Sequence, residues 1–105
     1  MHARVTTVSI NTAKIAEATT IYDANIGPSI AANKGFRGAL LLTDETTGEG
    51  VSITLWDTEA DGAAYEGSGS YKAQVDKLRS LFTAAPSLKT YSVGVEVKST
   101  AGVLG

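Results

Sequence analysis

The sequence predicts a small α+β domain of the ferredoxin-like βαββαβ kind, with one antiparallel sheet, that pairs with a copy of itself. Three observations lead to this fold class. The 105 residues leave room for one hydrophobic core. Strand-like and helix-like patterns follow in the order strand, helix, strand, strand, helix pair, strand, which places helices on one side of a sheet. One strand is apolar on both faces and needs a second cover.

The N-terminal part predicts a strand followed by a long helix. The run Ala3–Ile10 is rich in β-branched residues, which favour strands. Asn11 or Thr12 can then cap an amphipathic helix. Pro28 predicts a kink or short break inside that helix, and Gly35 a left-handed residue near its end. The apolar positions of the helix recur at three- and four-residue spacing: Ile15, Ala18, Tyr22, Ile26 and Ile30.

A β-hairpin follows. Residues Phe36–Thr43 read as a strand, and its centre, Ala39–Leu42, is apolar on both alternating faces. The segment Asp44–Gly50 is a polar, glycine-containing turn, and Val51–Trp56 alternates as the second strand of the hairpin. Helices can cover only one side of the first of these strands. The other side is therefore the expected contact with a second subunit.

Two helices and a last strand complete the expected order. Thr58 can cap a short helix that ends near Gly67, and Ser68 or Ser70 can cap the next one. The apolar face of that next helix is Tyr71, Val75, Leu78 and Phe82. A strand is expected over Leu88–Lys98, where valines alternate with polar residues. The domain then spans residues 1–98, with residues 99–105 as a C-terminal tail.

Composition excludes several classes of function. The formal charge of −2 gives no positive field to attract nucleic acid. The chain has no cysteine and only one histidine, His2, expected at a frayed N-terminus, so we expect no metal site. No stretch of apolar residues is long enough to span a membrane, and the N-terminus has no signal sequence, so we expect a cytoplasmic protein without membrane contact.

Three segments resemble one known family. They are Gly35-Phe36-Arg37-Gly38, the strand Ser52–Trp56 and the segment Ser68–Tyr71. In these and in the order of elements, from about Arg4 to Val97, the chain resembles the antibiotic biosynthesis monooxygenase family of dimeric α+β barrels. The resemblance implies a homodimer formed through the open face of the sheet. The family includes cofactor-independent oxygenases of polyphenolic substrates, haem-degrading enzymes and proteins of no known activity.

The haem-degrading branch of that family differs from this chain where the chemistry takes place. Its functional asparagine, tryptophan and histidine would fall near Arg4, on Tyr65 and on Val75. None of the three matches. We therefore expect no haem and no other cofactor.

Three residues are candidates for catalysis, each with a structural alternative. Trp56 ends a strand, where its indole N–H could donate to a ligand oxygen, although a large aromatic residue there more often closes a core. The hydroxyl of Tyr65 could donate to a phenolate or enolate oxygen. Asn25 lies one helical turn after Tyr22 and could give the cavity between helix and sheet a polar edge.

Three further residues are candidates for binding a substrate. Tyr22 lies on the apolar stripe of the first helix, and a core position is the simpler interpretation. Arg37 could neutralise an anionic intermediate, or pair with an acidic neighbour at the surface. Tyr71 flanks the glycine- and serine-rich link between the last helices, where packing is the alternative to a donor role.

Two hypotheses for function remain open. One is a cofactor-independent monooxygenase that acts on a small aromatic or quinol-type molecule, with the donors above stabilising a developing oxyanion. The other is a non-catalytic dimer that binds a small molecule or has a structural role, which the lack of a strong general base favours. RNA recognition is excluded because the strand Val51–Leu55 carries no aromatic residue.

Overall fold

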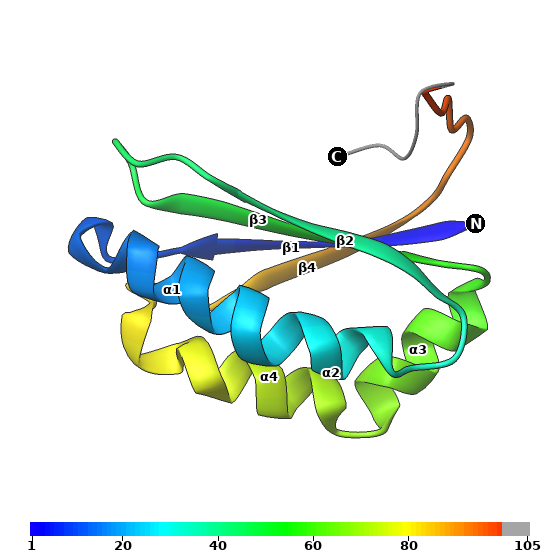
Figure 1. Cartoon of the computed structure of the whole chain (residues 1–105), viewed down its shortest axis with the longest axis horizontal. Coiled ribbons are helices and arrows are strands. Elements are labelled where there is room, and N and C mark those ends of the chain that lie inside the picture. The colour runs from blue at the N-terminus through cyan, green and yellow to red at the C-terminus, as the bar shows by residue number, and fades with distance from the viewer. Residues whose placement is uncertain (100–105) are drawn as a thin grey trace.

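The chain folds into one sheet covered on one face by helices (Figure 1). The computed structural model describes residues 1–99; residues 100–105 and the side chains of Ser70 and Tyr71 lie outside this description. The sheet has the order β2-β3-β1-β4, with all neighbouring strands antiparallel. This arrangement confirms the predicted α+β, ferredoxin-like fold. The strands are β1 (His2–Ser9), β2 (Phe36–Thr43), β3 (Glu49–Trp56) and β4 (Ser87–Ser92).

The first helical stretch follows one path but changes its geometry along the way. A 3₁₀ turn, η1 (Thr12–Lys14), leads into α1 (Ile15–Ile21), then a π-helical turn, η2 (Tyr22–Ile26), and finally α2 (Gly27–Ala31). Within η2 the N–H of Gly27 donates to the carbonyl of Tyr22, five residues back. The expected irregularity at Pro28 thus takes the form of a wide turn immediately before it, because proline supplies no N–H to continue the α-helical pattern.

The second helical stretch consists of α3 (Glu59–Gly67), α4 (Ser70–Leu78) and a 3₁₀ turn, η3 (Arg79–Leu81). The side chain of Thr58 accepts a hydrogen bond from the N–H of Asp61 at 3.1 Å, which confirms the predicted cap of α3. The expectation for α4 was wrong with respect to Ser68. The N-cap position is Gly69, whose φ of 85° makes the turn, while the Ser68 hydroxyl donates to the carbonyl of Tyr65.

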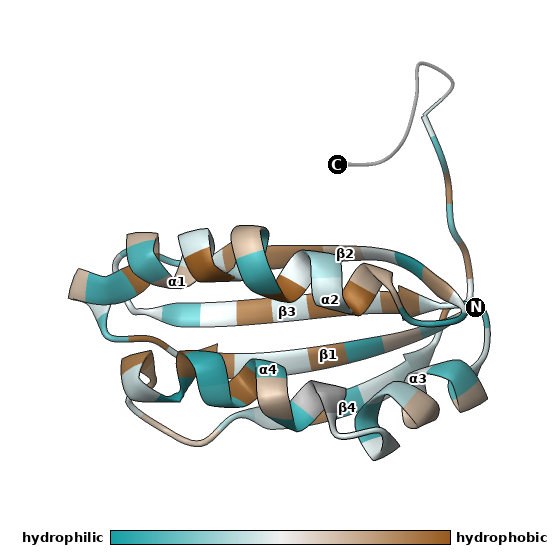
Figure 2. Cartoon of the chain, turned by 60° about the horizontal axis from the view of Figure 1, so that its bottom comes forward, coloured by the Kyte–Doolittle hydropathy of each residue, from teal (hydrophilic) through white to brown (hydrophobic). Residues whose placement is uncertain are grey.

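Hydrophobic residues occur in both the helices and the strands (Figure 2), and the core that they form lies between these two layers. Trp56 is its one fully buried large side chain among the described residues. Its ring meets Phe36 edge-on at 5.7 Å and stacks on Tyr65 at 5.2 Å between ring centroids. The other core residues are Val8, Ile10, Ile15, Ala18, Ile26, Ile30, Leu78 and Leu81.

The face of the sheet opposite the helices is apolar and has little cover. Leu40 and Leu42 on β2 are 41% and 49% exposed, and Tyr91 on β4 is 50% exposed. In the strand register Leu40 pairs with Ile53 and Leu42 with Val51, so the apolar surface continues across β3. The strand β2 therefore carries apolar residues on both faces, as its sequence indicated.

The last strand is shorter than predicted. It ends at Ser92 instead of Lys98, and residues 93–99 leave the sheet (Figure 1). The register gives the reason: Ser92 pairs with His2, the first residue of β1, and the N–H of Val93 then bonds to the carbonyl of Met1. Beyond this point β1 offers no further partner. Val95 and Val97 are consequently 81% and 79% exposed.

The same register corrects the expectation for His2. This residue pairs with Trp56 on one side and Ser92 on the other, and it is buried instead of frayed. β1 lies between β3 and β4 in the sheet, so its first residue has a paired strand on each side.

Within residues 1–99 no helix combines the length and the apolar character needed to cross a membrane.

Candidate functional site

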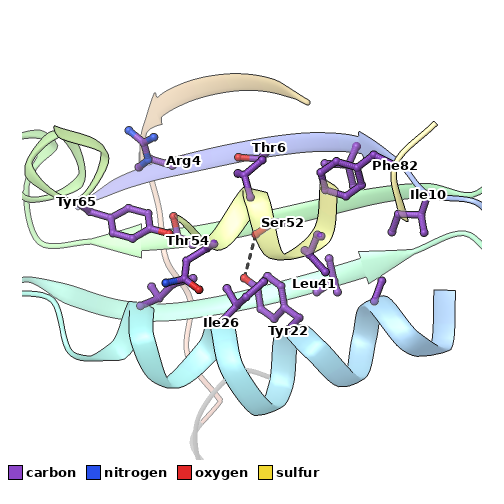
Figure 3. A pocket seen from close by; sticks show the side chains of 16 residues that line it. Arg4, Thr6, Ile10, Tyr22, Ile26, Leu41, Ser52, Thr54, Tyr65 and Phe82 are labelled. Atoms are coloured by element: carbon purple, nitrogen blue, oxygen red, sulfur yellow. Dashed lines mark hydrogen bonds between the residues drawn. The ribbon is translucent and has the colours of Figure 1, made fainter. Parts of the chain in front are cut away.

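A partly open cavity of about 60 Å³ lies between the helical layer and the sheet (Figure 3). Strands β1, β2 and β3 form its floor, and the helical stretches form its walls. Most of the lining side chains are apolar, and the polar ones come mainly from the sheet. The lining residues in chain order are Arg4, Thr6, Val8, Ile10, Ala18, Tyr22, Ile26, Ile30, Leu41, Ser52, Thr54, Tyr65, Gln74, Val75, Leu78 and Phe82.

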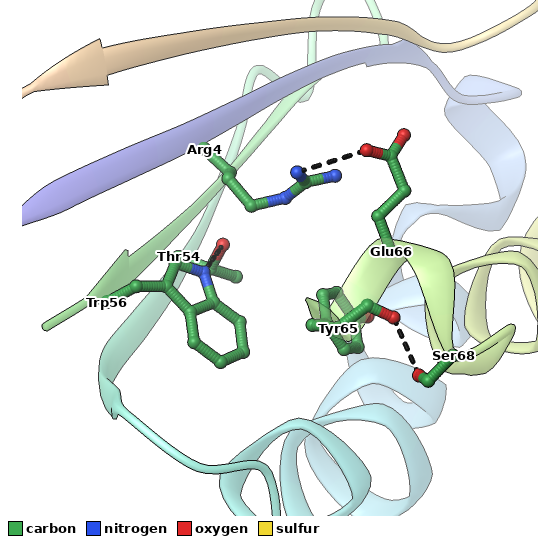
Figure 4. A network of polar contacts seen from close by, with 6 residues as sticks. All are labelled: Arg4, Thr54, Trp56, Tyr65, Glu66 and Ser68. Carbon is green, nitrogen blue, oxygen red and sulfur yellow. Dashed lines mark hydrogen bonds and ion pairs between the residues drawn. The ribbon is translucent and has the colours of Figure 1, made fainter. Parts of the chain in front are cut away.

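Arg4 brings a permanent positive charge to this cavity. It is only 5% exposed, and its Nη1 lies 3.3 Å from a carboxylate oxygen of Glu66 on α3 (Figure 4). The close approach of α3 depends on Gly62, since a Cβ at that position would lie 3.1 Å from the Arg4 side chain and 3.3 Å from Trp56. The glycine thus lets the helix lie directly over the arginine and the tryptophan.

Trp56 supports the cavity wall from behind. It is not among the lining residues, and its indole N–H donates to the Thr54 hydroxyl at 2.9 Å. Because Thr54 accepts this hydrogen bond, its own hydroxyl hydrogen is directed elsewhere. The Trp56 ring also stacks on Tyr65, which does line the cavity (Figure 4). The tryptophan therefore orients two lining residues without itself facing a ligand.

Tyr22 and Ser52 join the helical wall to the sheet. Their hydroxyl oxygens are 2.9 Å apart, and either group can donate (Figure 3). Burial raises the pKa of the Tyr22 phenol above its ordinary value, and the hydrogen bond with Ser52 offsets part of that rise. Tyr22 is thus a neutral hydrogen-bonding group at physiological pH.

Gln74 on α4 contributes an acceptor. The side chain is 6% exposed, and its Oε1 has no hydrogen-bond partner in the described structure. Buried polar atoms are normally paired, because leaving one unpaired costs free energy. Gln74 is therefore the clearest unmet hydrogen-bonding capacity in the cavity wall.

The cavity has a polar end and an apolar end. In Figure 3 Arg4 and Tyr65 lie at one end, the Tyr22–Ser52 pair lies in the middle, and Ile10 and Phe82 lie at the other end. Such an arrangement suits a small apolar ligand with polar substituents on one side.

The structure brings two of the sequence-derived candidates together and separates the rest. Tyr22 and Tyr65 line the cavity, whereas Asn25 is exposed on η2 and Trp56 lies behind the wall. Arg37 is exposed at the start of β2 and forms an ion pair with Asp57 at 2.9 Å. This carboxylate raises the pKa of Arg37. The side chain of Tyr71 lies outside the described residues.

Five polar lining residues were missed: Arg4, Thr6, Ser52, Thr54 and Gln74. The first four occupy alternate positions on β1 and β3, and their pairing shows that they share the helix-facing side of the sheet. The sequence alone did not show which side of each strand faced the helices. For Gln74 a signal was available, because it lies three residues after Tyr71 and four before Leu78, on the predicted apolar face of its helix.

The lining residues do not include a set of metal ligands. The described part of the chain contains no group of three or more histidine, aspartate or glutamate side chains placed to hold a metal ion. Arg4 is the only charged residue among those that line the cavity.

One protein-family model matches most of the chain. The model for antibiotic biosynthesis monooxygenases matches residues 1–77. The chain belongs to the antibiotic biosynthesis monooxygenase family. The match includes β1 to β3, α3 and most of α4, and with them nearly all residues of the cavity. A search of curated protein sequences found no significant match.

Solved structures share the fold of this family member over almost its whole length. The cofactor-independent oxygenase SnoaB from Streptomyces nogalater is 17% identical, with a TM-score of 0.75 over 93% of this chain and 97% of that one. A monooxygenase from Streptomyces coelicolor in complex with nanaomycin D is also 17% identical, with a TM-score of 0.75 over 93% and 92% of the two chains.

A haem-degrading enzyme, MhuD from Mycobacterium tuberculosis, has the same fold. It is 16% identical, with a TM-score of 0.75 over 92% of this chain and 99% of that one. At these identities the similarity establishes the fold and leaves the chemistry open. The three positions expected to differ from haem-degrading enzymes, Arg4, Tyr65 and Val75, all line the cavity.

Proposed function

We propose that this protein is a homodimeric, cofactor-independent monooxygenase that oxidises a small hydroxylated aromatic molecule of the quinol type. The cavity between helices and sheet is the site of the reaction. The observation that carries the proposal is that cavity: a mostly apolar space in a family of monooxygenases, with a buried cation and tyrosine hydroxyls in its wall.

The residues of the cavity support this chemistry through binding and electrostatics. Apolar walls exclude water, which strengthens every polar interaction inside. The positive charge of Arg4 favours the ionised form of a substrate hydroxyl, and the ionised ring is the form that gives up electrons to molecular oxygen. Tyr22 and Tyr65 can donate hydrogen bonds to oxygen atoms on which negative charge develops.

The size of the cavity limits how a substrate can sit in it. An apolar cavity that holds benzene measures roughly 150 Å³, whereas the space enclosed here is about 60 Å³. A ring must therefore extend through the opening or displace part of the wall. The π-helical turn η2 supplies Tyr22 and Ile26 to that wall, and π-helical turns are frequent at functional sites.

One observation favours a second candidate, a dimer that binds such a ligand without converting it. The lining residues include no histidine, aspartate or glutamate that could act as a general base. A substrate would have to enter already ionised or lose its proton to water. Binding and turnover therefore need to be measured separately.

Oxygen uptake with a panel of quinols tests the proposal. We expect the wild-type protein to consume oxygen with at least one member of the panel. Tyr65→Phe and Tyr22→Phe should lower the rate roughly tenfold or more, since each removes a hydroxyl donor and keeps the ring. Thr46→Val is the control because Thr46 is exposed in the turn between β2 and β3 and does not line the cavity.

The outcomes separate the two candidates. Quinol binding without oxygen uptake would support the non-catalytic dimer. Oxygen uptake that is unchanged in both cavity variants would show that the reaction takes place elsewhere, and the proposed site would then be wrong.

A further inference from the structure

We infer that Arg4 and Gln74, two polar residues of the cavity wall, make the cavity selective for a ligand that carries both an ionised oxygen and a separate O–H donor. The monoanion of a dihydroxylated aromatic ring is the simplest ligand of this kind. The inference rests on the proposed function, since it assumes that the cavity takes a small aromatic molecule, and it specifies which substituents that molecule carries.

Gln74 sets the need for a donor. Its Oε1 is a pure acceptor, the side chain is nine-tenths buried, and no described residue donates to it. A ligand with only acceptor oxygens would leave this atom unpaired. A protonated hydroxyl on the ligand would supply the missing hydrogen bond.

Arg4 sets the need for an anion. Its guanidinium is positively charged, and Glu66, with which it forms an ion pair, has a side chain that is about half exposed to solvent. No other charged residue lines the cavity. An anionic oxygen beside Arg4 therefore meets a positive charge that Glu66 shares from the solvent side, in a mostly apolar space where the attraction is stronger than in water.

The other end of the cavity determines how such a ligand is oriented. Ile10 and Phe82 form an apolar end, opposite Arg4 and Tyr65 (Figure 3). A ring with its polar substituents on one side therefore points at least the ionised one toward Arg4, and places its unsubstituted side against the apolar residues.

A purely structural role for Gln74 predicts a different response to substitution. Replacing a buried unpaired acceptor by an apolar residue of similar size removes an unmet hydrogen-bonding group, so Gln74→Met should keep or raise the thermal midpoint. If Gln74 serves the fold instead, Gln74→Met should melt earlier. Arg4→Met breaks the ion pair with Glu66 and should lower the midpoint in either case, so the role of Arg4 is decided by ligand binding alone.

The test measures the binding of four nitroaromatic probes. Binding is measured at equilibrium, so no reaction with oxygen is needed. The nitro group makes one hydroxyl ionise near neutral pH in 4-nitrocatechol, in nitrohydroquinone and in 4-nitrophenol. The first two keep a second, protonated hydroxyl, the third has none, and nitrobenzene has neither group. Binding is followed by calorimetry and by the fluorescence of Trp56, the only tryptophan in the chain.

We expect the wild-type protein to bind the better of the two dihydroxy probes roughly tenfold more tightly than 4-nitrophenol, and 4-nitrophenol more tightly than nitrobenzene. Gln74→Met should abolish the first difference and keep the second. Arg4→Met should abolish the second. Arg79→Met is the matched control, since Arg79 is exposed on η3 and pairs with Asp76.

Three results would overturn the inference. Equal binding of all four probes by the wild-type protein would remove the selectivity while leaving the proposed aromatic site intact. An unchanged ranking in Gln74→Met, or in Gln74→Leu as a second variant, would remove Gln74 from recognition. Failure of every probe to bind, nitrobenzene included, would sink the proposed function itself along with the inference.

Discussion

Single hydroxyl groups hold the helical wall of the cavity against its floor. The hydrogen bond between Tyr22 and Ser52 spans thirty positions of sequence and links η2 to β3. Trp56 and Thr54 form a second hydrogen-bonded pair, two positions apart within β3. Each pair includes at least one residue that lines the cavity, so substitutions at either partner act on the same site.

The Tyr22 phenol should make stability depend on alkaline pH. Its pKa in the folded protein is raised by burial above the ordinary value of about 10. The folded state therefore favours the protonated phenol. This contribution is fully present below about pH 10 and is lost as the pH rises through the higher pKa of the folded state.

Urea unfolding between about pH 8 and about pH 11 measures this contribution. At the alkaline end, the free energy of unfolding of the wild-type protein should fall more steeply than that of Tyr22→Phe, because the phenylalanine at position 22 cannot ionise. Thr46→Val, which removes an exposed hydroxyl group that does not ionise in this range, should behave like the wild type. Identical slopes in the wild-type protein and Tyr22→Phe would contradict the raised pKa.

The Trp56–Thr54 pair should show energetic coupling. Trp56→Phe removes the indole donor and part of a fully buried ring, and we expect it to lower the free energy of unfolding by about 1–3 kcal/mol. Thr54→Val leaves the indole N–H unpaired in the core and should cost about as much. The double variant should lose less than the sum, by about 1 kcal/mol. Strict additivity in chemical denaturation would show that the hydrogen bond contributes nothing.

The candidate site was only partly predictable at the residue scale. Tyr22 was found because it lies on an apolar helical stripe, which must face the core wherever the helix packs. Arg4 and Thr54 were not found, because a polar residue in a strand is normally assigned to the solvent side. Here the same alternation places them toward the helices, while the apolar pairs Leu40–Ile53 and Leu42–Val51 lie on the outer face. Periodicity gives the two sides of a strand without saying which one is covered.

At the scale of elements, the contact of α3 with the sheet depends on a single small residue. Gly62 faces Arg4 and Trp56, and both side chains are buried. An added methyl group would have to displace one of them by a few tenths of an ångström. The helix therefore sits at the distance from the sheet that its glycine permits.

Substituting alanine for two glycines of the same helix separates packing from helix propensity. Gly67→Ala should stabilise the protein by about 0.5–1 kcal/mol, since its Cβ would meet nothing within 4 Å. Gly62→Ala carries the same propensity gain but crowds the Trp56 ring and the Arg4 side chain, so we expect a net loss of stability. Thermal unfolding of both variants is the measurement. A gain in Gly62→Ala equal to that in Gly67→Ala would show that α3 is free to shift.

The elements themselves were largely predictable, and the two differences have physical causes. The apolar spacing from Ile15 to Ile30 describes one face of a helix, but the spacing does not reveal the π-helical turn that Pro28 and its missing donor favour. The alternation of valines beyond Ser92 indicates a strand, yet a strand also needs a partner for its backbone groups. β1 offers none beyond Met1, so the pattern is present without the pairing.

At the scale of the whole molecule, one face of the sheet is incompletely covered. A small domain gains a large fraction of its stability from buried apolar surface, and here Leu40, Leu42 and Tyr91 remain about half exposed. Contiguous apolar patches of this kind mark sites of association. We propose that a second copy of the chain covers this face, as the membership of the family suggests.

A charged residue placed on that apolar face should dissociate the dimer. In a two-fold symmetric contact each substitution occurs twice, so Leu40→Lys places two unpaired charges in one apolar interface. We expect its dimer dissociation constant to rise at least roughly 100-fold in sedimentation equilibrium, with an unchanged circular dichroism spectrum because Leu40 is already 41% exposed in the single chain. Ala63→Lys, on the exposed side of α3, carries the same charge and should leave association unchanged. A wild-type monomer, or a Leu40→Lys dimer of unaltered affinity, would show that the open face is covered by something other than a second copy.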